Sequence, residues 1–82
     1  MNYAEYWAVV FGPFMSAEQI VSKHELKIDR ERSPRRNRLD LRDWVTRQEA
    51  EAINQGARLS DIDIAHEKAT DALLSVMIDQ MV

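Results

Sequence analysis

The sequence predicts one small all-α domain, a bundle of three to four short helices, and three observations support this expectation. The chain has 82 residues, which suffice for one hydrophobic core but not for a second. Apolar residues recur at three- and four-residue spacing, whereas no stretch shows the two-residue alternation of a half-buried strand. The strongest chain breakers, two glycines and two prolines, fall between the periodic stretches.

The N-terminal part of the chain is expected to hold two helices. The first covers residues 3–10 and ends before Gly12 and Pro13, because proline cannot continue a helix and restricts the residue before it. The second covers residues 17–28. Ser16 is expected to cap it, because a glutamine stands three residues further on and completes a capping box.

An arginine-rich stretch, DRERSPRRNRLDLR at residues 29–42, follows the second helix. It holds six arginines and three acidic residues, a local charge of +3 in a chain of net charge −3. Ser33 and Pro34 lie near its centre, and the restriction that a proline places on the preceding residue predicts a non-helical connection over residues 29–39. Exposed and mobile side chains are therefore expected for Arg35, Arg36 and Arg38.

The third helix is expected to follow Asp40, which is a suitable N-cap residue, with Asp43 in its first turn. Trp44 and Val45 mark its inner face. Trp44 is expected in the core, because aromatic side chains supply the largest buried areas of a small domain. Gly56 is expected just past the end of this helix, where the chain commonly takes a left-handed conformation.

The last helix is expected over residues 61–81, and from Ala72 onward it is apolar on most of its circumference. A helix of this kind needs more than one neighbour to cover it. In a chain of 82 residues, one layer of helices covers only one side of it. The sequence therefore predicts a homodimer that forms through this helix, with an interface at Leu74, Ile78 and Met81.

The six arginines are the candidate partner-binding residues, because a guanidinium group presents a planar fork that suits carboxylate or phosphate. They are Arg30, Arg32, Arg35, Arg36, Arg38 and Arg42. Three interpretations stay open: a solvated or internally paired loop, a contact for an acidic protein surface, and a contact for nucleic-acid phosphates. The acidic composition of the rest of the domain weighs against the last, because DNA-binding domains are usually basic.

Patterns for catalysis and metal binding are weak. The chain has no cysteine and no glycine-rich phosphate loop, and carboxylates two residues apart point to different sides of a helix. Asp63, His66 and Glu67 stand at helical spacing, but a di-metal site in a bundle needs more carboxylates and a second histidine on facing helices. We interpret them as a solvated acidic face with a surface histidine. No metal, no cofactor and no enzymatic activity are expected.

The expected function is therefore a small non-enzymatic protein-protein interaction module, a regulator, inhibitor or accessory subunit that occupies an acidic surface of a larger partner. The alternative is a nucleic-acid-binding regulator that contacts phosphates through residues 30–42. The expected setting is the cytoplasm without a membrane. The N-terminal segment has no basic region, and its longest apolar run, residues 6–11, is far shorter than a membrane span of about 20 residues.

Overall fold

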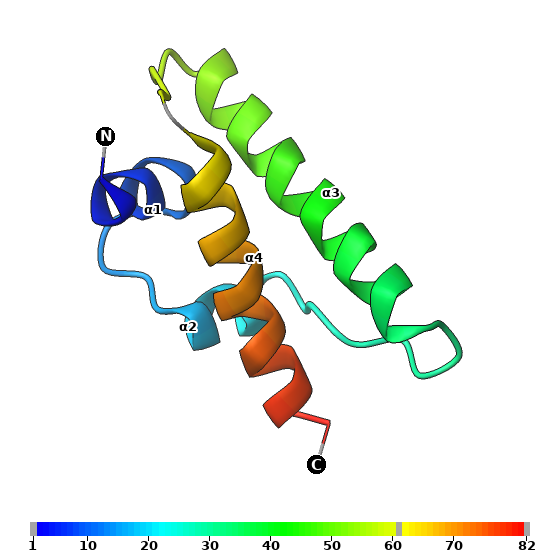
Figure 1. The fold of residues 1–82 in the computed structure, drawn as a ribbon. Helices are drawn as coiled ribbons and strands as arrows, with labels where there is room; N and C mark the ends of the chain where they lie inside the picture. The colour runs from blue at the N-terminus through cyan, green and yellow to red at the C-terminus, as the bar shows by residue number, and fades with distance from the viewer. Residues whose placement is uncertain (1, 61, 82) are drawn as a thin grey trace.

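The computed structural model describes residues 2–60 and 62–81. These residues form four helices and no strand (Figure 1): α1 (Tyr3–Phe11), α2 (Ala17–Lys23), α3 (Pro34–Asn54) and α4 (Ile62–Asp79). The predicted all-α class is confirmed, with the larger of the expected numbers of helices. No helix in the described part of the chain is long and apolar enough to cross a membrane.

The two longest helices, α3 and α4, run side by side in opposite directions (Figure 1). The helix α1 packs against both of them, and α2 packs against α4. The segment between α2 and α3 then crosses the molecule and leads to the start of α3 (Figure 1). This arrangement covers α4 with three neighbours over part of its length, as a helix with apolar residues on several sides requires.

Polar side chains close the N-terminal ends of α1 and α2. Asn2 Oδ1 accepts a hydrogen bond from Glu5 N at 2.9 Å. Ser16 Oγ accepts from Gln19 N at 3.1 Å, and Gln19 Oε1 accepts from Ser16 N at 2.7 Å. The predicted capping box is therefore present, and it satisfies backbone donors that the start of a helix leaves without partners.

The helix α2 ends at Lys23 and not at residue 28, so its predicted length was wrong. The chain leaves the helix because Glu25 adopts a left-handed conformation with φ of 52°. The amide of Leu26 then donates back to the carbonyl oxygen of Val21 at 3.0 Å, in the hydrogen-bonding pattern of a Schellman motif. A glycine usually takes this position, so the glutamate in the sequence did not indicate the end of a helix here.

The helix α3 begins at Pro34, and the predicted start after Asp40 was wrong. Ser33 is the N-cap, and its Oγ accepts a hydrogen bond from Arg36 N at 3.1 Å. Proline suits the first helical position, because no N–H donor is needed there and its fixed φ matches the helix. The restriction before proline falls on Ser33, which is extended with ψ of 155°. The predicted connection over residues 29–39 is therefore helical from residue 34 onward.

The end of α3 agrees with the prediction. Gly56 has φ of 99°, and the amide of Ala57 donates back to the carbonyl oxygen of Ala52 at 3.0 Å. A short connection leads to α4, which lies within the predicted range of 61–81. Asp61, the first residue of that range, lies outside the described residues.

The main core lies between α2, α3 and α4. Its buried apolar side chains are Ile20, Val21, Leu41, Val45, Leu73 and Met77. The half-buried Trp44 packs against this cluster, as predicted, and its ring stacks on that of Phe11 with centroids 6.0 Å apart. A smaller cluster around Tyr6, Ala65 and Ala69 joins α1 to α4.

Candidate functional site

An apolar groove of about 350 Å³ lies beside the C-terminal half of α4. The segment between α2 and α3, the start of α3 and α4 itself form its walls. Its lining includes Ile28, Arg30, Arg32, Leu74, Ile78 and Met81, and we call this site the apolar groove. All three predicted interface residues line it together with two of the six candidate arginines. The arginine-rich stretch and the apolar end of α4, which lie far apart in the sequence, therefore meet at one surface.

A buried asparagine holds the segment that forms one wall of the groove. Asn37 Nδ2 donates to the carbonyl oxygens of Asp29 at 2.9 Å, Ser33 at 3.0 Å and Arg32 at 3.3 Å. Its Oδ1 accepts from Asp29 N at 2.8 Å. The side chain thus supplies the backbone partners that an irregular segment lacks. Asn37 was missed at the sequence level, where it is one polar residue in a highly charged stretch.

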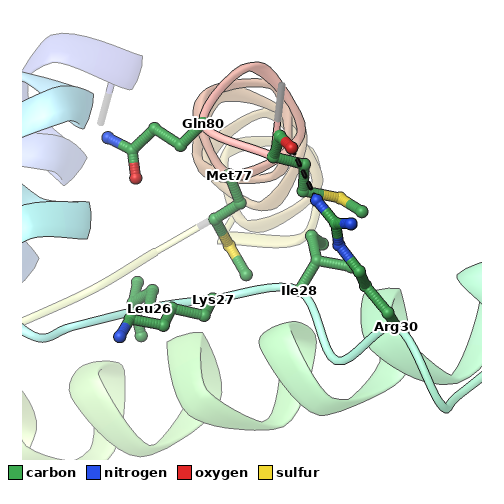
Figure 2. Close-up of a pocket in the computed structure, with 7 residues that line it drawn as sticks. Leu26, Lys27, Ile28, Arg30, Met77 and Gln80 are labelled. Carbon is green, nitrogen blue, oxygen red and sulfur yellow. Dashed lines mark hydrogen bonds between the residues drawn. The ribbon is translucent and has the colours of Figure 1, made fainter.

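A smaller pocket of about 250 Å³ adjoins the apolar groove and shares Ile28, Arg30 and Met81 with it (Figure 2). Arg30 Nη2 donates to the carbonyl oxygen of Met81 at 2.6 Å. Met81 lies in the turn that follows α4, where backbone carbonyl groups need partners outside the helix. Arg30 therefore joins the segment before α3 to the turn after α4.

Two of the candidate arginines share one carboxylate on α3. Arg32 Nη1 lies 3.1 Å from Asp40 Oδ2, and Arg36 Nε lies 3.3 Å from Asp40 Oδ1. These side chains are substantially exposed, and pairs of this kind contribute little to stability. Asp40, which was predicted to cap a helix, instead neutralises part of the positive charge of this stretch.

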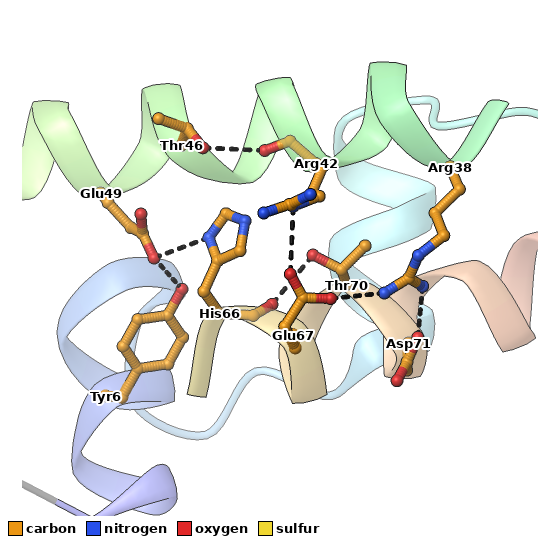
Figure 3. Close-up of polar contacts among 9 residues, drawn as sticks. All are labelled: Tyr6, Arg38, Arg42, Thr46, Glu49, His66, Glu67, Thr70 and Asp71. Carbon is orange, nitrogen blue, oxygen red and sulfur yellow. Dashed lines mark hydrogen bonds and ion pairs between the residues drawn. The ribbon is translucent and has the colours of Figure 1, made fainter. Parts of the chain in front are cut away.

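Two further arginines connect α3 to α4 (Figure 3). Arg38 Nη2 lies 2.6 Å from Glu67 Oε2, and its Nη1 donates to Asp71. Arg42 Nε lies 3.1 Å from Glu67 Oε1. The hydrogen bond to Asp71, together with the contacts to Glu67, raises the pKa of Arg38 above its ordinary value. Arg38 was expected to be exposed, but it is half-buried and pairs with two carboxylates of α4.

The remaining candidate, Arg35, is exposed in the first turn of α3. No ion pair involving it is present among the described residues. Of the three interpretations of the arginine-rich stretch, internal pairing therefore describes Arg32, Arg36, Arg38 and Arg42. The pairing was hard to foresee, because the acidic partners of Arg38 and Arg42 lie on a helix that is distant in the sequence.

A buried polar cluster joins α1, α3 and α4 (Figure 3). Tyr6 Oη donates to Glu49 Oε2 at 2.5 Å, and His66 Nδ1 lies 3.0 Å from the same oxygen. The three residues are 1%, 5% and 9% exposed. Burial, followed by the hydrogen bond to Glu49, raises the pKa of Tyr6 well above its ordinary value of about 10. None of these residues lines the two pockets described above.

The interpretation of His66 as a surface residue was wrong, and the spacing held a signal for its burial. His66, Thr70, Leu73 and Met77 are all buried and follow one another at four-, three- and four-residue steps. Such spacing places residues on one helix face. A search for apolar periodicity misses this stripe, because His66 and Thr70 are polar.

The residues considered for a metal site do not converge. Asp63 is exposed, His66 contacts Glu49, and Glu67 pairs with arginines. Among the described residues, no group of three or more histidine, aspartate or glutamate side chains has the geometry to hold a metal ion. His66 and Glu67 instead take part in contacts between helices.

Comparison of the sequence with protein-family models finds no matching family, and comparisons with curated proteins and with solved structures find no match. We therefore infer a function from the geometry of this chain.

Proposed function

We propose that this protein is a small non-enzymatic interaction module that binds a segment of a protein partner in the apolar groove. The bound segment presents an apolar side chain to the groove and carboxylates to its arginines. The observation that carries the proposal is the shared lining of the groove, in which Leu74, Ile78 and Met81 lie with Arg30 and Arg32. This combination suits one chemical class of partner, a protein segment that is both apolar and acidic.

The apolar part of the groove includes side chains that the fold itself leaves uncovered. Ile78 is 50% exposed on α4, whereas Leu74 is half-buried and also packs against the core. Removing apolar surface from water is the main driving force of protein association. A partner that covers Ile78 and the adjoining Leu74 therefore gains affinity without any rearrangement of the core.

The two arginines of the groove keep donors for a partner. Arg30 uses Nη2 for the carbonyl oxygen of Met81, and Arg32 uses Nη1 for Asp40. A guanidinium group has five N–H donors, so one contact leaves several of them available. Asp29 also lines the groove, but its carboxylate accepts a hydrogen bond from Glu31 N at 2.9 Å. Carboxylates of the partner are therefore expected on the arginine side of the groove.

The alternative function, a contact for nucleic-acid phosphates, has weaker support. Phosphate binding needs arginines that can neutralise an external anion. Four of the six candidates, Arg32, Arg36, Arg38 and Arg42, each pair with a carboxylate of this chain. A phosphate backbone would have to compete with these carboxylates at four positions, whereas a segment in the apolar groove meets such competition at Arg32 alone.

A short probe peptide tests the proposed function. The peptide contains one phenylalanine flanked by glutamates, and the control peptide carries lysines in place of the glutamates. The peptide is titrated into the protein at millimolar concentration while amide chemical shifts are recorded. Binding should change the chemical shifts of the residues around Ile28, Ile78 and Met81. The lysine peptide should bind more weakly, because like charges at the groove disfavour it.

A matched pair of variants controls for effects on the helix itself. Ile78→Lys places a cation in the groove, whereas Ile64→Lys makes the same change at an α4 residue that is 74% exposed and does not line the groove. Ile78→Lys should abolish the perturbations, and Ile64→Lys should leave them unchanged. Shifts elsewhere on the molecule, or equal binding of the two peptides, contradict the proposed function.

A further inference from the structure

Phe14 is an exposed aromatic side chain in a strained backbone conformation. It lies between α1 and α2, its side chain is 100% exposed, and its φ is 67°. Residues other than glycine rarely adopt this left-handed conformation, and aromatic side chains are normally among the most buried of a small domain. Two unfavourable features at one residue indicate that the loop has a purpose beyond connecting two helices.

The loop that carries Phe14 is fixed at both ends. On one side, Gly12 caps α1 and its amide donates to the carbonyl oxygen of Ala8 at 3.0 Å. On the other side, Trp7 Nε1 donates to the carbonyl oxygen of Met15 at 2.6 Å, and the capping box of α2 begins at Ser16. The backbone position of Phe14 is therefore fixed, and binding to a partner does not require the loop to become ordered.

We propose that Phe14 of one molecule binds in the apolar groove of a second copy of this chain. This inference rests on the proposed function and names the partner segment, the loop of residues 12–16. The groove, at about 350 Å³, falls in the range of pockets that take compact ligands, and its apolar lining suits an aromatic ring.

The charges around the two surfaces are complementary. Residues 2–22 contain Glu5 and Glu18 and no basic residue. The charged residues that line the groove are Arg30, Arg32 and Asp29, a net charge of +1. Phe14 thus lies in a stretch of the chain whose charged residues are both acidic, and opposite charges favour its encounter with the arginines of the groove.

A molecule does not fill its own groove in this way. Phe14 is fully exposed, and Figure 1 places the loop between α1 and α2 and the segment before α3 on different sides of the molecule. The contact joins two different surfaces, so each added copy brings both an unbound Phe14 side chain and an empty groove. The copies therefore form either a closed cyclic oligomer or an open filament. This differs from a symmetric contact between two α4 helices.

Sedimentation velocity over a range of concentrations tests the inference with two variants. Phe14→Asn removes the ring and keeps a residue that tolerates the left-handed conformation. Ile78→Lys blocks the groove. The unchanged protein should sediment with a mass above that of the monomer, and this mass should rise with concentration. Each variant alone should remain monomeric. Ile64→Lys should behave as the unchanged protein, and circular dichroism should show equal helicity throughout.

The decisive measurement is a mixture of the two variants. The Phe14→Asn molecule keeps its groove and the Ile78→Lys molecule keeps its ring, so the mixture should form a dimer of one of each and nothing larger. A symmetric α4 contact predicts instead that Phe14→Asn still associates and that the mixture gains nothing. Met81→Lys provides a second groove variant if Ile78→Lys loses helicity.

The outcomes separate this inference from the function on which it rests. If the unchanged protein is monomeric at every concentration, or if Phe14→Asn associates as strongly, the inference is overturned. The proposed function still stands in either case when the acidic probe peptide perturbs the groove. If neither copies of the chain nor the peptide occupy the groove, both proposals fail.

Discussion

Replacing Tyr6 by phenylalanine should destabilise the protein through one hydrogen bond. Tyr6→Phe keeps the buried ring and removes only the hydroxyl that donates to Glu49 Oε2 at 2.5 Å. Glu49 is buried and retains a single described partner, His66. A hydrogen bond to a charged group contributes about 1.5–3 kcal/mol, because the buried acceptor is otherwise left without its donor. We therefore expect a loss of about 2 kcal/mol in the free energy of unfolding.

Thermal unfolding followed by circular dichroism measures this loss. For a domain of this size, 1 kcal/mol corresponds to about 4–8 °C, so Tm should fall by on the order of 10 °C. Tyr3→Phe is the matched control, because Tyr3 lies on the same helix and its hydroxyl has no described hydrogen bond to a carboxylate. It should melt close to the unchanged protein. Equal Tm values for the two variants would refute the reasoning.

The same hydrogen bond predicts a pH dependence. Burial and the contact with Glu49 raise the pKa of Tyr6 in the folded state, while the unfolded chain keeps the ordinary value of about 10. Above that pH the unfolded chain loses a proton that the folded protein retains, so stability falls as pH rises. The unchanged protein should therefore lose stability above about pH 10 more steeply than Tyr6→Phe. Parallel curves for the two proteins in this range contradict the assignment.

The arginine contacts and the segment beside the groove give two further tests. Arg38→Glu places a carboxylate beside Glu67 and should lower the free energy of unfolding by about 1 kcal/mol, or Tm by about 5 °C. Arg35→Glu, the control, should leave Tm unchanged. Equal effects of the two variants argue against a specific role for the pairing. Asn37→Ala removes the bonds that hold Asp29 and its neighbours and should cost about 2 kcal/mol while weakening binding of the acidic probe peptide. Unchanged peptide binding in that variant would mean that the groove does not depend on this asparagine.

Local signals predicted the helical class and most helix ends. The capping box at Ser16 and the glycine at position 56 act through residues within one turn, so the sequence displays them directly. The start of α3 shows the limit of such signals, because a Ser–Pro pair suits either an irregular connection or a helix that begins at the proline. The structure takes the second option, with Ser33 as the cap.

Contacts between distant residues decided the parts that could not be predicted. Glu49 and His66 meet across two helices, and each alone is typical of a solvated helix face. Arg38 has its acidic partners on α4, so its charge suggested an exposed side chain. Pairing of this kind depends on how the helices lie against each other, and the apolar periodicity of a single helix does not contain that information.

The segment between α2 and α3 explains why the arginines and the apolar stripe of α4 form one site. Leu26 and Ile28 pack against the core, Asn37 holds the backbone between them and α3, and Arg30 binds the carbonyl oxygen of Met81. These contacts exist within the chain and need no partner. Ordering a loop on binding reduces affinity, so a groove that is already formed retains more of the gain from covering Ile78. The contact of Arg30 with Met81 fixes one wall of the groove, as the proposed binding of a partner segment requires.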